Sequence, residues 1–143
     1  FQGLGPEPFV DLTEELFLDL LKKAKLPIKQ LLMDQKRIAG VGNIYASDAL
    51  WKAMIDPRRS ATSLTEKESK RLYTAVLFVL TEGLKHQGAS ETNFFHVDGG
   101  KGEYQNHFLV YGQTGKPCKR CENVIKRIVL GGRGTFICQA CQK

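Results

Sequence analysis

Apolar residues recur every three or four positions over most of the first 88 residues, which is the spacing of helices with one buried face. Asp11 and Glu14 match the capping box that opens a helix. Thr65 and Glu68 form a second such box, and Gly88 is a residue at which a helix commonly stops. Helices are therefore predicted over residues 12–24, 27–35, 44–54 and 66–87.

The segments between and after these helices are rich in glycine. Gly40-Val41-Gly42 predicts a tight turn, and Asn43 is placed to cap the helix that follows. Residues 89–104 lack the helical periodicity and are predicted to form a loop. This loop is longer than a simple connection between two elements, which indicates a functional or mobile segment. Two short β stretches are predicted near 125–129 and 135–137. The pattern predicts a mainly α fold with a helical domain over 1–88, a loop over 89–104 and a small β-hairpin module over 105–143.

Composition is ordinary for a globular protein, with 42% hydrophobic and 25% charged residues, but the charge is unevenly distributed. The first 115 residues carry 14 basic and 14 acidic side chains, so the formal net charge of +6 falls entirely on residues 116–143. A basic appendage on a neutral body favours contact with a polyanion, nucleic acid first. The alternative is a tail that only improves solubility. No apolar run is long enough for a membrane span.

The same basic segment holds all four cysteines, arranged as two Cys-x-x-Cys pairs separated by sixteen residues. Two such pairs joined by a hairpin offer four thiolates at tetrahedral corners, the geometry that Zn²⁺ prefers. With four protein ligands the site would be closed and structural. The alternative is two disulfides, but the sequence shows no secretory feature. One structural zinc ion is predicted, bound by Cys118, Cys121, Cys138 and Cys141.

Two further features suit contact with phosphate. Arg133 stands between Gly132 and Gly134 at the tip of the predicted hairpin, where a guanidinium is free of neighbouring bulk. The glycine turn before Asn43 lies at a helix start, where backbone N–H groups and the helix dipole favour an anion. The alternatives are an exposed turn arginine and an ordinary N-cap asparagine. No nucleotide P-loop and no nucleophile–base pair stands out in the sequence.

Several segments together resemble the bacterial formamidopyrimidine-DNA glycosylases, which are helix–two-turn–helix repair enzymes. The turn sequence Asn-Ile-Tyr-Ala is more similar to this branch than to the related endonuclease VIII branch. The resemblance extends over almost the whole chain. It is carried by Leu4–Pro8, Ile28–Gln35, Ala39–Ala46, Val110–Gly112, the four cysteines, Gly132–Thr135 and Cys141-Gln142.

The resemblance implies a bifunctional DNA glycosylase and AP lyase of base excision repair, which removes oxidised purines such as 8-oxoguanine and formamidopyrimidines from double-stranded DNA. It implies that Asn43 and Arg133 grip phosphates on either side of the flipped nucleotide, with Gly42 and Lys29 also at the DNA. Residues 89–104 correspond to a loop that closes over the extruded base. The lesion-contacting candidates in that loop are Ser90, Thr92 and Phe94.

The family nucleophile is an N-terminal proline amine on a β-rich domain, and nothing in this sequence matches that domain. Pro6-Glu7 does not substitute for it, because an internal proline nitrogen is an amide. We therefore expect a fragment without catalytic residues, inactive alone, whose partners are damaged duplex DNA and the missing N-terminal catalytic domain. The resemblance further implies a bacterial cytoplasmic, nucleoid-associated monomer without a membrane partner.

The finger departs from the family pattern at Asn123, which replaces a smaller residue. Two interpretations from other functional classes stay open at this point. One is a non-catalytic nucleic-acid-binding module built on a zinc ribbon. The other is a zinc-stabilised protein-interaction domain, which would show no salt-dependent affinity for DNA.

Overall fold

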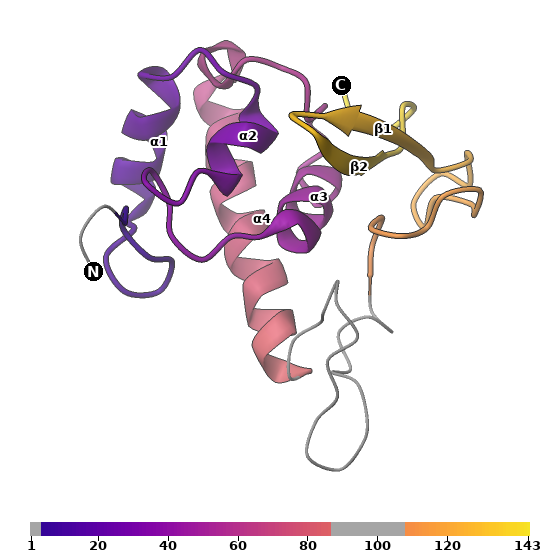
Figure 1. The fold of residues 1–143 in the computed structure, drawn as a ribbon, viewed down its shortest axis with the longest axis horizontal. Helices are drawn as coiled ribbons and strands as arrows, with labels where there is room; N and C mark the ends of the chain where they lie inside the picture. The colour runs from indigo at the N-terminus through magenta and orange to yellow at the C-terminus, as the bar shows by residue number, and fades with distance from the viewer. Residues whose placement is uncertain (1–3, 87–107) are drawn as a thin grey trace.

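The computed structural model describes residues 4–86 and 108–143. Over these residues the chain is mainly helical and ends in a two-stranded hairpin, which confirms the predicted fold class. Figure 1 shows the helices grouped on one side and the hairpin beside α3. The elements in chain order are α1 (Glu14–Lys22), α2 (Ile28–Met33), α3 (Asn43–Lys52), the 3₁₀ turn η1 (Ala61–Ser63), α4 (Glu66–Lys85), β1 (Lys126–Leu130) and β2 (Arg133–Ile137).

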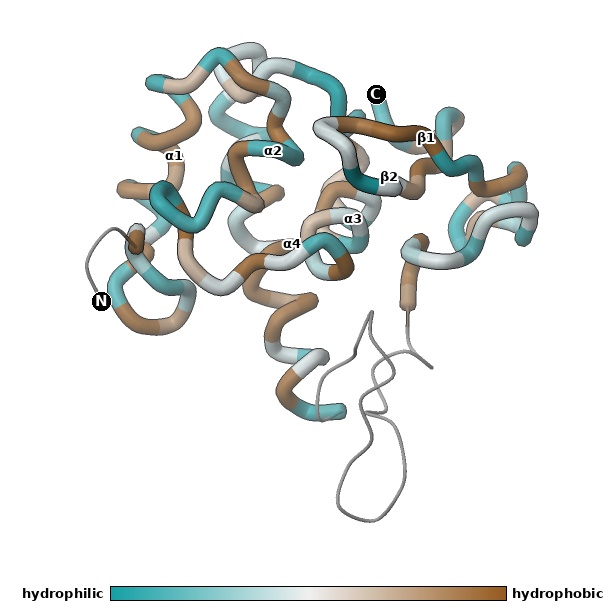
Figure 2. Tube along the Cα trace, viewed as in Figure 1, coloured by the Kyte–Doolittle hydropathy of each residue, from teal (hydrophilic) through white to brown (hydrophobic). Residues whose placement is uncertain are grey.

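Helix α4 is the element against which α1 and α3 pack. It begins at the predicted capping box, in which the Thr65 hydroxyl accepts from the Glu68 backbone N–H and the Glu68 carboxylate accepts from that of Thr65. Brown apolar segments alternate with teal polar ones along the helices in Figure 2, as one buried face requires. The buried residues of this helical core all fall between Leu12 and Val79.

The first helix starts two residues later than the sequence predicted. The Thr13 hydroxyl, not Asp11, caps α1 by accepting from the Leu16 backbone N–H at 3.1 Å. Asp11 instead accepts from the Glu7 backbone N–H at 2.6 Å, closing the turn before the helix. Both side chains are good cap residues, and the competing local turn decides between them.

The segment that precedes α1 crosses the loop between α2 and α3. The Gly5 backbone N–H donates to the Gln35 carbonyl at 2.8 Å, and the Ala39 N–H donates to the Pro6 carbonyl at 3.0 Å. A Cβ atom on Gly5 would lie 2.4 Å from the carbonyl carbon and oxygen of Arg37. Only glycine therefore permits this close approach of two backbones.

The hairpin turns through Gly131 and Gly132, whose φ angles of 59° and 77° suit the two-residue turn that antiparallel strands favour. Leu130 pairs with Arg133 across this turn. Arg133 is thus the first residue of β2 rather than part of the tip, which corrects the expected placement. A second, smaller buried cluster forms around the cysteines and includes Trp51 from α3.

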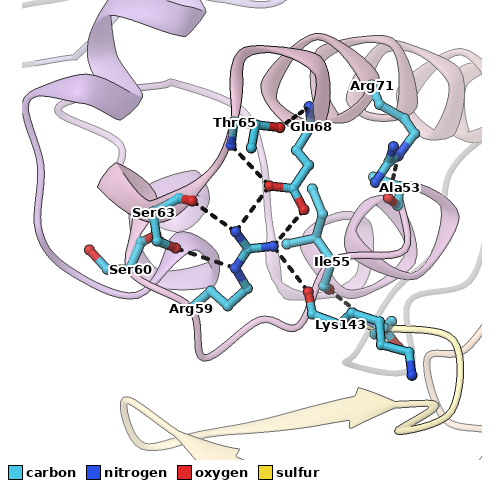
Figure 3. A network of polar contacts seen from close by, with 10 residues as sticks. Ala53, Ile55, Arg59, Ser60, Ser63, Thr65, Glu68, Arg71 and Lys143 are labelled. Carbon is cyan, nitrogen blue, oxygen red and sulfur yellow. Dashed lines mark hydrogen bonds and ion pairs between the residues drawn. The ribbon is translucent and has the colours of Figure 1, made fainter.

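The end of the chain is held to the helical body by a polar network (Figure 3). The Arg59 guanidinium donates to the Glu68 carboxylate at 2.6 and 3.0 Å and to the Lys143 carbonyl at 3.0 Å. Gln142 is buried, donating to the Ile55 carbonyl and accepting from the Cys138 backbone N–H. No helix among the described residues is both long and apolar enough to cross a membrane.

Candidate nucleic-acid interface and metal centre

The four cysteine sulfur atoms gather at the base of the hairpin and lie within 4.8 Å of one another. Cys118 and Cys141 are 3.9 Å apart, and Cys121 and Cys138 are 3.4 Å apart. Zinc–thiolate bonds of about 2.3 Å in a tetrahedron place sulfur atoms about 3.8 Å apart, so this spacing fits one zinc ion. All four positions are filled by protein thiols, which makes the site structural.

Hydrogen bonds to the sulfur atoms divide the thiols into two kinds. The Asn123 side chain, together with its backbone N–H, lowers the pKa of Cys121 to about 6. Burial acts to raise the pKa of Cys118, but N–H donors outweigh it and the pKa is lowered. Burial raises the pKa of Cys138 to about 12 and also raises that of Cys141.

Helix α3 connects the metal centre to the helical body. The Trp51 indole N–H donates to the Cys118 sulfur at 3.3 Å, and the Arg120 guanidinium lies 3.9 Å from the centre of the Trp51 ring. One turn earlier, the fully buried Asp48 carboxylate accepts three backbone N–H groups, from Leu109, Val110 and Tyr111, at 2.9–3.1 Å. The chain entering the finger is thus fixed to α3.

The turn before α3 is built around Gln35 and Gly40. Gly40 has a φ of +92°, and its N–H donates to the Gln35 side chain at 2.8 Å. The Gln35 amide donates in turn to the Val41 carbonyl at 3.2 Å. Gly42 is the N-cap of α3, and a Cβ atom there would meet nothing within 4 Å. The backbone at this helix start is therefore open to close approach.

Asn43 is the first residue of α3 and does not cap it, so the N-cap interpretation was wrong. Its side chain is buried and donates through Nδ2 to the Gly134 carbonyl at 3.1 Å. Its Oδ1 accepts from the Lys29 ammonium at 2.5 Å. The asparagine therefore joins the glycine turn to strand β2 of the finger.

Arg133 lies directly before the strand residue that Asn43 contacts, and it is exposed. It lines a groove of about 410 Å³ between α2 and the hairpin. Lys29 and Gln30 of α2 line the same groove, and Gly131 lies opposite Gln30. The structure thus brings Lys29, Asn43 and Arg133 together at one junction between helices and finger, although they are distant in sequence.

Lys29, the remaining candidate for a residue at the DNA, is buried in the structure. Its side chain is 1% exposed, and its ammonium also donates to the Thr135 hydroxyl at 2.7 Å. The loop candidates Ser90, Thr92 and Phe94 lie outside the described residues.

Sequence reasoning did not anticipate the roles of Asp48, Trp51 and Gln142. Asp48 did carry a signal, because it stands four residues after Ile44 and three before Trp51 on the apolar face of a predicted helix. A charged residue at a buried helical position is unusual and commonly has partners. Gln142 carried no such signal.

These features define a helical domain joined to a four-cysteine finger, and comparisons with known proteins assign it to a family. Residues 4–95 match the model of the formamidopyrimidine-DNA glycosylase H2TH domain, and residues 115–143 match that of the zinc finger found in FPG and IleRS. The chain belongs to the formamidopyrimidine-DNA glycosylase family.

Individual relatives agree with this assignment. The formamidopyrimidine-DNA glycosylase of Chloroflexus aggregans is 45% identical over 139 residues, covering 96% of this chain and 50% of the relative. That of Herpetosiphon aurantiacus is 46% identical over 142 residues, covering 99% and 52%. The chain therefore spans about half the length of the curated relatives it matches.

Solved structures share the fold closely. The MutM (Fpg) protein of Thermus thermophilus has a TM-score of 0.92 and 43% identity, covering 98% of this chain and 54% of that one. Lactococcus lactis Fpg in complex with DNA containing an abasic site has a TM-score of 0.90 and 37% identity, covering 99% and 52%.

Proposed function

We propose that this chain is the DNA-gripping part of a base-excision-repair glycosylase and AP lyase. In this proposal Asn43 and Arg133 hold phosphates on either side of a flipped nucleotide, and the whole protein removes oxidised purines, 8-oxoguanine and formamidopyrimidines among them. The observation that carries the proposal is the 3.1 Å hydrogen bond from Asn43 to the carbonyl of Gly134, the neighbour of Arg133. One strand of DNA lying across that junction would meet both residues.

Three properties of the junction support a phosphate-binding role. Gly42 leaves open space at the N-terminus of the ten-residue helix α3, where backbone N–H groups and the helix dipole favour an anion. Arg133 offers an exposed guanidinium, which binds phosphate through two parallel hydrogen bonds. The finger segment that contains Arg133 also carries the whole formal net charge of +6.

Bond cleavage, in this proposal, depends on a catalytic domain in the portion of the relatives that this chain does not span. The chain alone would bind DNA without excising a base. Damaged DNA as the ligand of the whole protein is supported by a solved relative, a Lactococcus lactis Fpg mutant in complex with DNA containing Fapy-dG. We further propose that the protein acts as a monomer at the bacterial nucleoid, in the cytoplasm.

The test is binding of the zinc-loaded chain to a duplex containing a tetrahydrofuran abasic-site analogue, measured across a series of salt concentrations. Arg133→Ala should weaken binding and lower the slope of log K against log salt by about 0.9, the loss of one phosphate contact. Asn43→Ala should weaken binding with little change in slope. Arg58→Ala, which removes an exposed arginine paired with Asp56, is the matched control and should change neither quantity.

Unchanged affinity in both Arg133→Ala and Asn43→Ala would reject the phosphate grip. Equal affinity for abasic and intact duplex, tested after adding the catalytic domain, would favour a general nucleic-acid-binding zinc ribbon. Absence of salt-dependent binding would favour a protein-interaction domain. A covalent adduct trapped by borohydride with this chain alone would show that it is catalytic.

A further inference from the structure

A buried lysine stands at the centre of the junction between the helices and the finger. Lys29 lies on α2 with 1% of its surface exposed, and its ammonium donates to Asn43 Oδ1 at 2.5 Å and to Thr135 Oγ1 at 2.7 Å. Taking an ammonium out of water is unfavourable unless strong hydrogen bonds compensate. The two acceptors come from residues 14 and 106 positions away in the sequence.

Two contacts, one on each side, fix which way the Asn43 amide faces. A lysine ammonium can donate hydrogen bonds but cannot accept them, so only the amide oxygen of Asn43 can point toward Lys29. The amide nitrogen must then point the other way, where it donates to the Gly134 carbonyl at 3.1 Å. The Gly134 carbonyl can only accept hydrogen bonds, so both contacts require the same orientation of the amide.

The second contact of Lys29 extends toward the arginine. The Thr135 hydroxyl, fully buried, accepts from Lys29 and donates to the Arg133 carbonyl at 3.1 Å. One hydrogen bond therefore links the lysine to Asn43, and two successive bonds link it to the backbone of Arg133. Linked hydrogen bonds of this kind polarise and strengthen one another in a buried site.

We propose that Lys29 is a positioning residue, which sets the relative placement of Asn43 and Arg133 without touching DNA itself. The inference rests on the proposed phosphate grip and adds the device that holds its two sides in register. A lysine in direct contact with phosphate would need an ammonium open to solvent, whereas this one faces an amide oxygen and a hydroxyl inside the protein.

The decisive experiment compares four variants of the zinc-loaded chain in the same salt series and with the same abasic-analogue duplex. They are Lys29→Met, Asn43→Ala, the double variant Lys29→Met/Asn43→Ala, and Lys67→Met. Methionine matches the lysine side chain as far as Cε and lacks the ammonium with its charge and donors. Lys67, exposed on α4, provides the same substitution away from the junction. Zinc content and thermal unfolding show which variants are folded. If Lys29→Met does not fold, Lys29→Gln is used in its place.

A positioning role predicts that Lys29→Met weakens binding with an unchanged salt slope. The losses in the double variant should be less than additive, because both substitutions disable the Asn43 side of the junction. A slope reduced by about 0.9, with additive losses in the double variant, would instead mean that Lys29 contacts a phosphate, and would overturn the proposal. Lys67→Met should resemble the unmodified chain.

A second measurement does not depend on DNA and separates this inference from the proposed function. In the NMR spectrum of the zinc-loaded chain, the Asn43 side-chain amide protons should show cross-peaks to strand β2 near Gly134. Lys29→Met should shift the amide resonances and weaken those cross-peaks, whereas Lys67→Met should not. Unchanged Asn43 amide signals in Lys29→Met would refute positioning even if the chain failed to bind DNA.

Discussion

Asp48 provides the most quantitative test of how the finger is attached to the helical body. Its carboxylate is fully buried, with Oδ1 accepting from Val110 and Tyr111 and Oδ2 accepting from Leu109. Asp48→Asn keeps the shape of the side chain but replaces one of its two acceptor oxygens with an NH₂ group. That NH₂ group must then face at least one of the backbone N–H groups, with which it cannot form a hydrogen bond. Hydrogen bonds to a charged group contribute about 1.5–3 kcal/mol and neutral ones about 0.5–1.5 kcal/mol.

Losing one of these bonds and weakening two others gives a destabilisation of about 2–4 kcal/mol, after allowing for the easier burial of a neutral amide. For a chain of this size that corresponds to a fall in Tm of about 6–12 °C. The assay is urea and thermal unfolding of the zinc-loaded chain at neutral pH. Asp19→Asn, which alters an exposed ion pair with Lys23, is the matched control and should change stability by less than about 0.5 kcal/mol. An Asp48→Asn effect as small as that of the control would show that the three bonds do not hold the finger.

Three further outcomes follow from the contacts described. Chelating the zinc should shift the fluorescence of Trp51, the single tryptophan, to the red while the helical circular dichroism persists. Acidification should destabilise the chain, since the Arg59 side chain lowers the pKa of Glu68 from 4.5 to about 2. That contribution is present above about pH 4.5 and is lost as the pH falls through about 2; solvent screening limits it to about 1 kcal/mol. Gly5→Ala should lower the free energy of unfolding by about 1–3 kcal/mol, because the added Cβ would clash with backbone atoms, which cannot move away as a flexible side chain can.

For each of these three predictions, one experimental outcome would contradict it. Loss of most helical signal on chelation would mean that the helical core depends on the metal. A Glu68→Gln variant with the same acid profile as the unmodified chain would remove Glu68 as a source of pH dependence. An undiminished Tm in Gly5→Ala would show that the backbone crossing at Arg37 is not tightly packed.

The sequence predicted those features that depend on neighbours in the chain. Cysteine spacing identified the metal ligands, and the Thr65–Glu68 box located the start of α4 to the residue. Glycines located the hairpin turn, although the strand boundaries moved by one or two residues.

Contacts between distant segments were not predictable in this way. Asn43 has the local pattern of an N-cap, and only the approach of Lys29 and Gly134, 14 and 91 residues away, gives its side chain another role. The bond between Trp51 and Cys118 spans 67 residues. Helical periodicity shows that such side chains are buried but not which partners they meet, because it contains no information on tertiary packing.

Helix α3 touches the finger at three successive points, through Asn43, Asp48 and Trp51. The length of α3 therefore sets the distance between the glycine turn and the metal site. A consequence for protein engineering is that a finger exchanged between relatives should function only if the matching α3 is transplanted with it. A chimera joined at residue 108 would keep every cysteine, but its Arg133 would be displaced relative to Asn43.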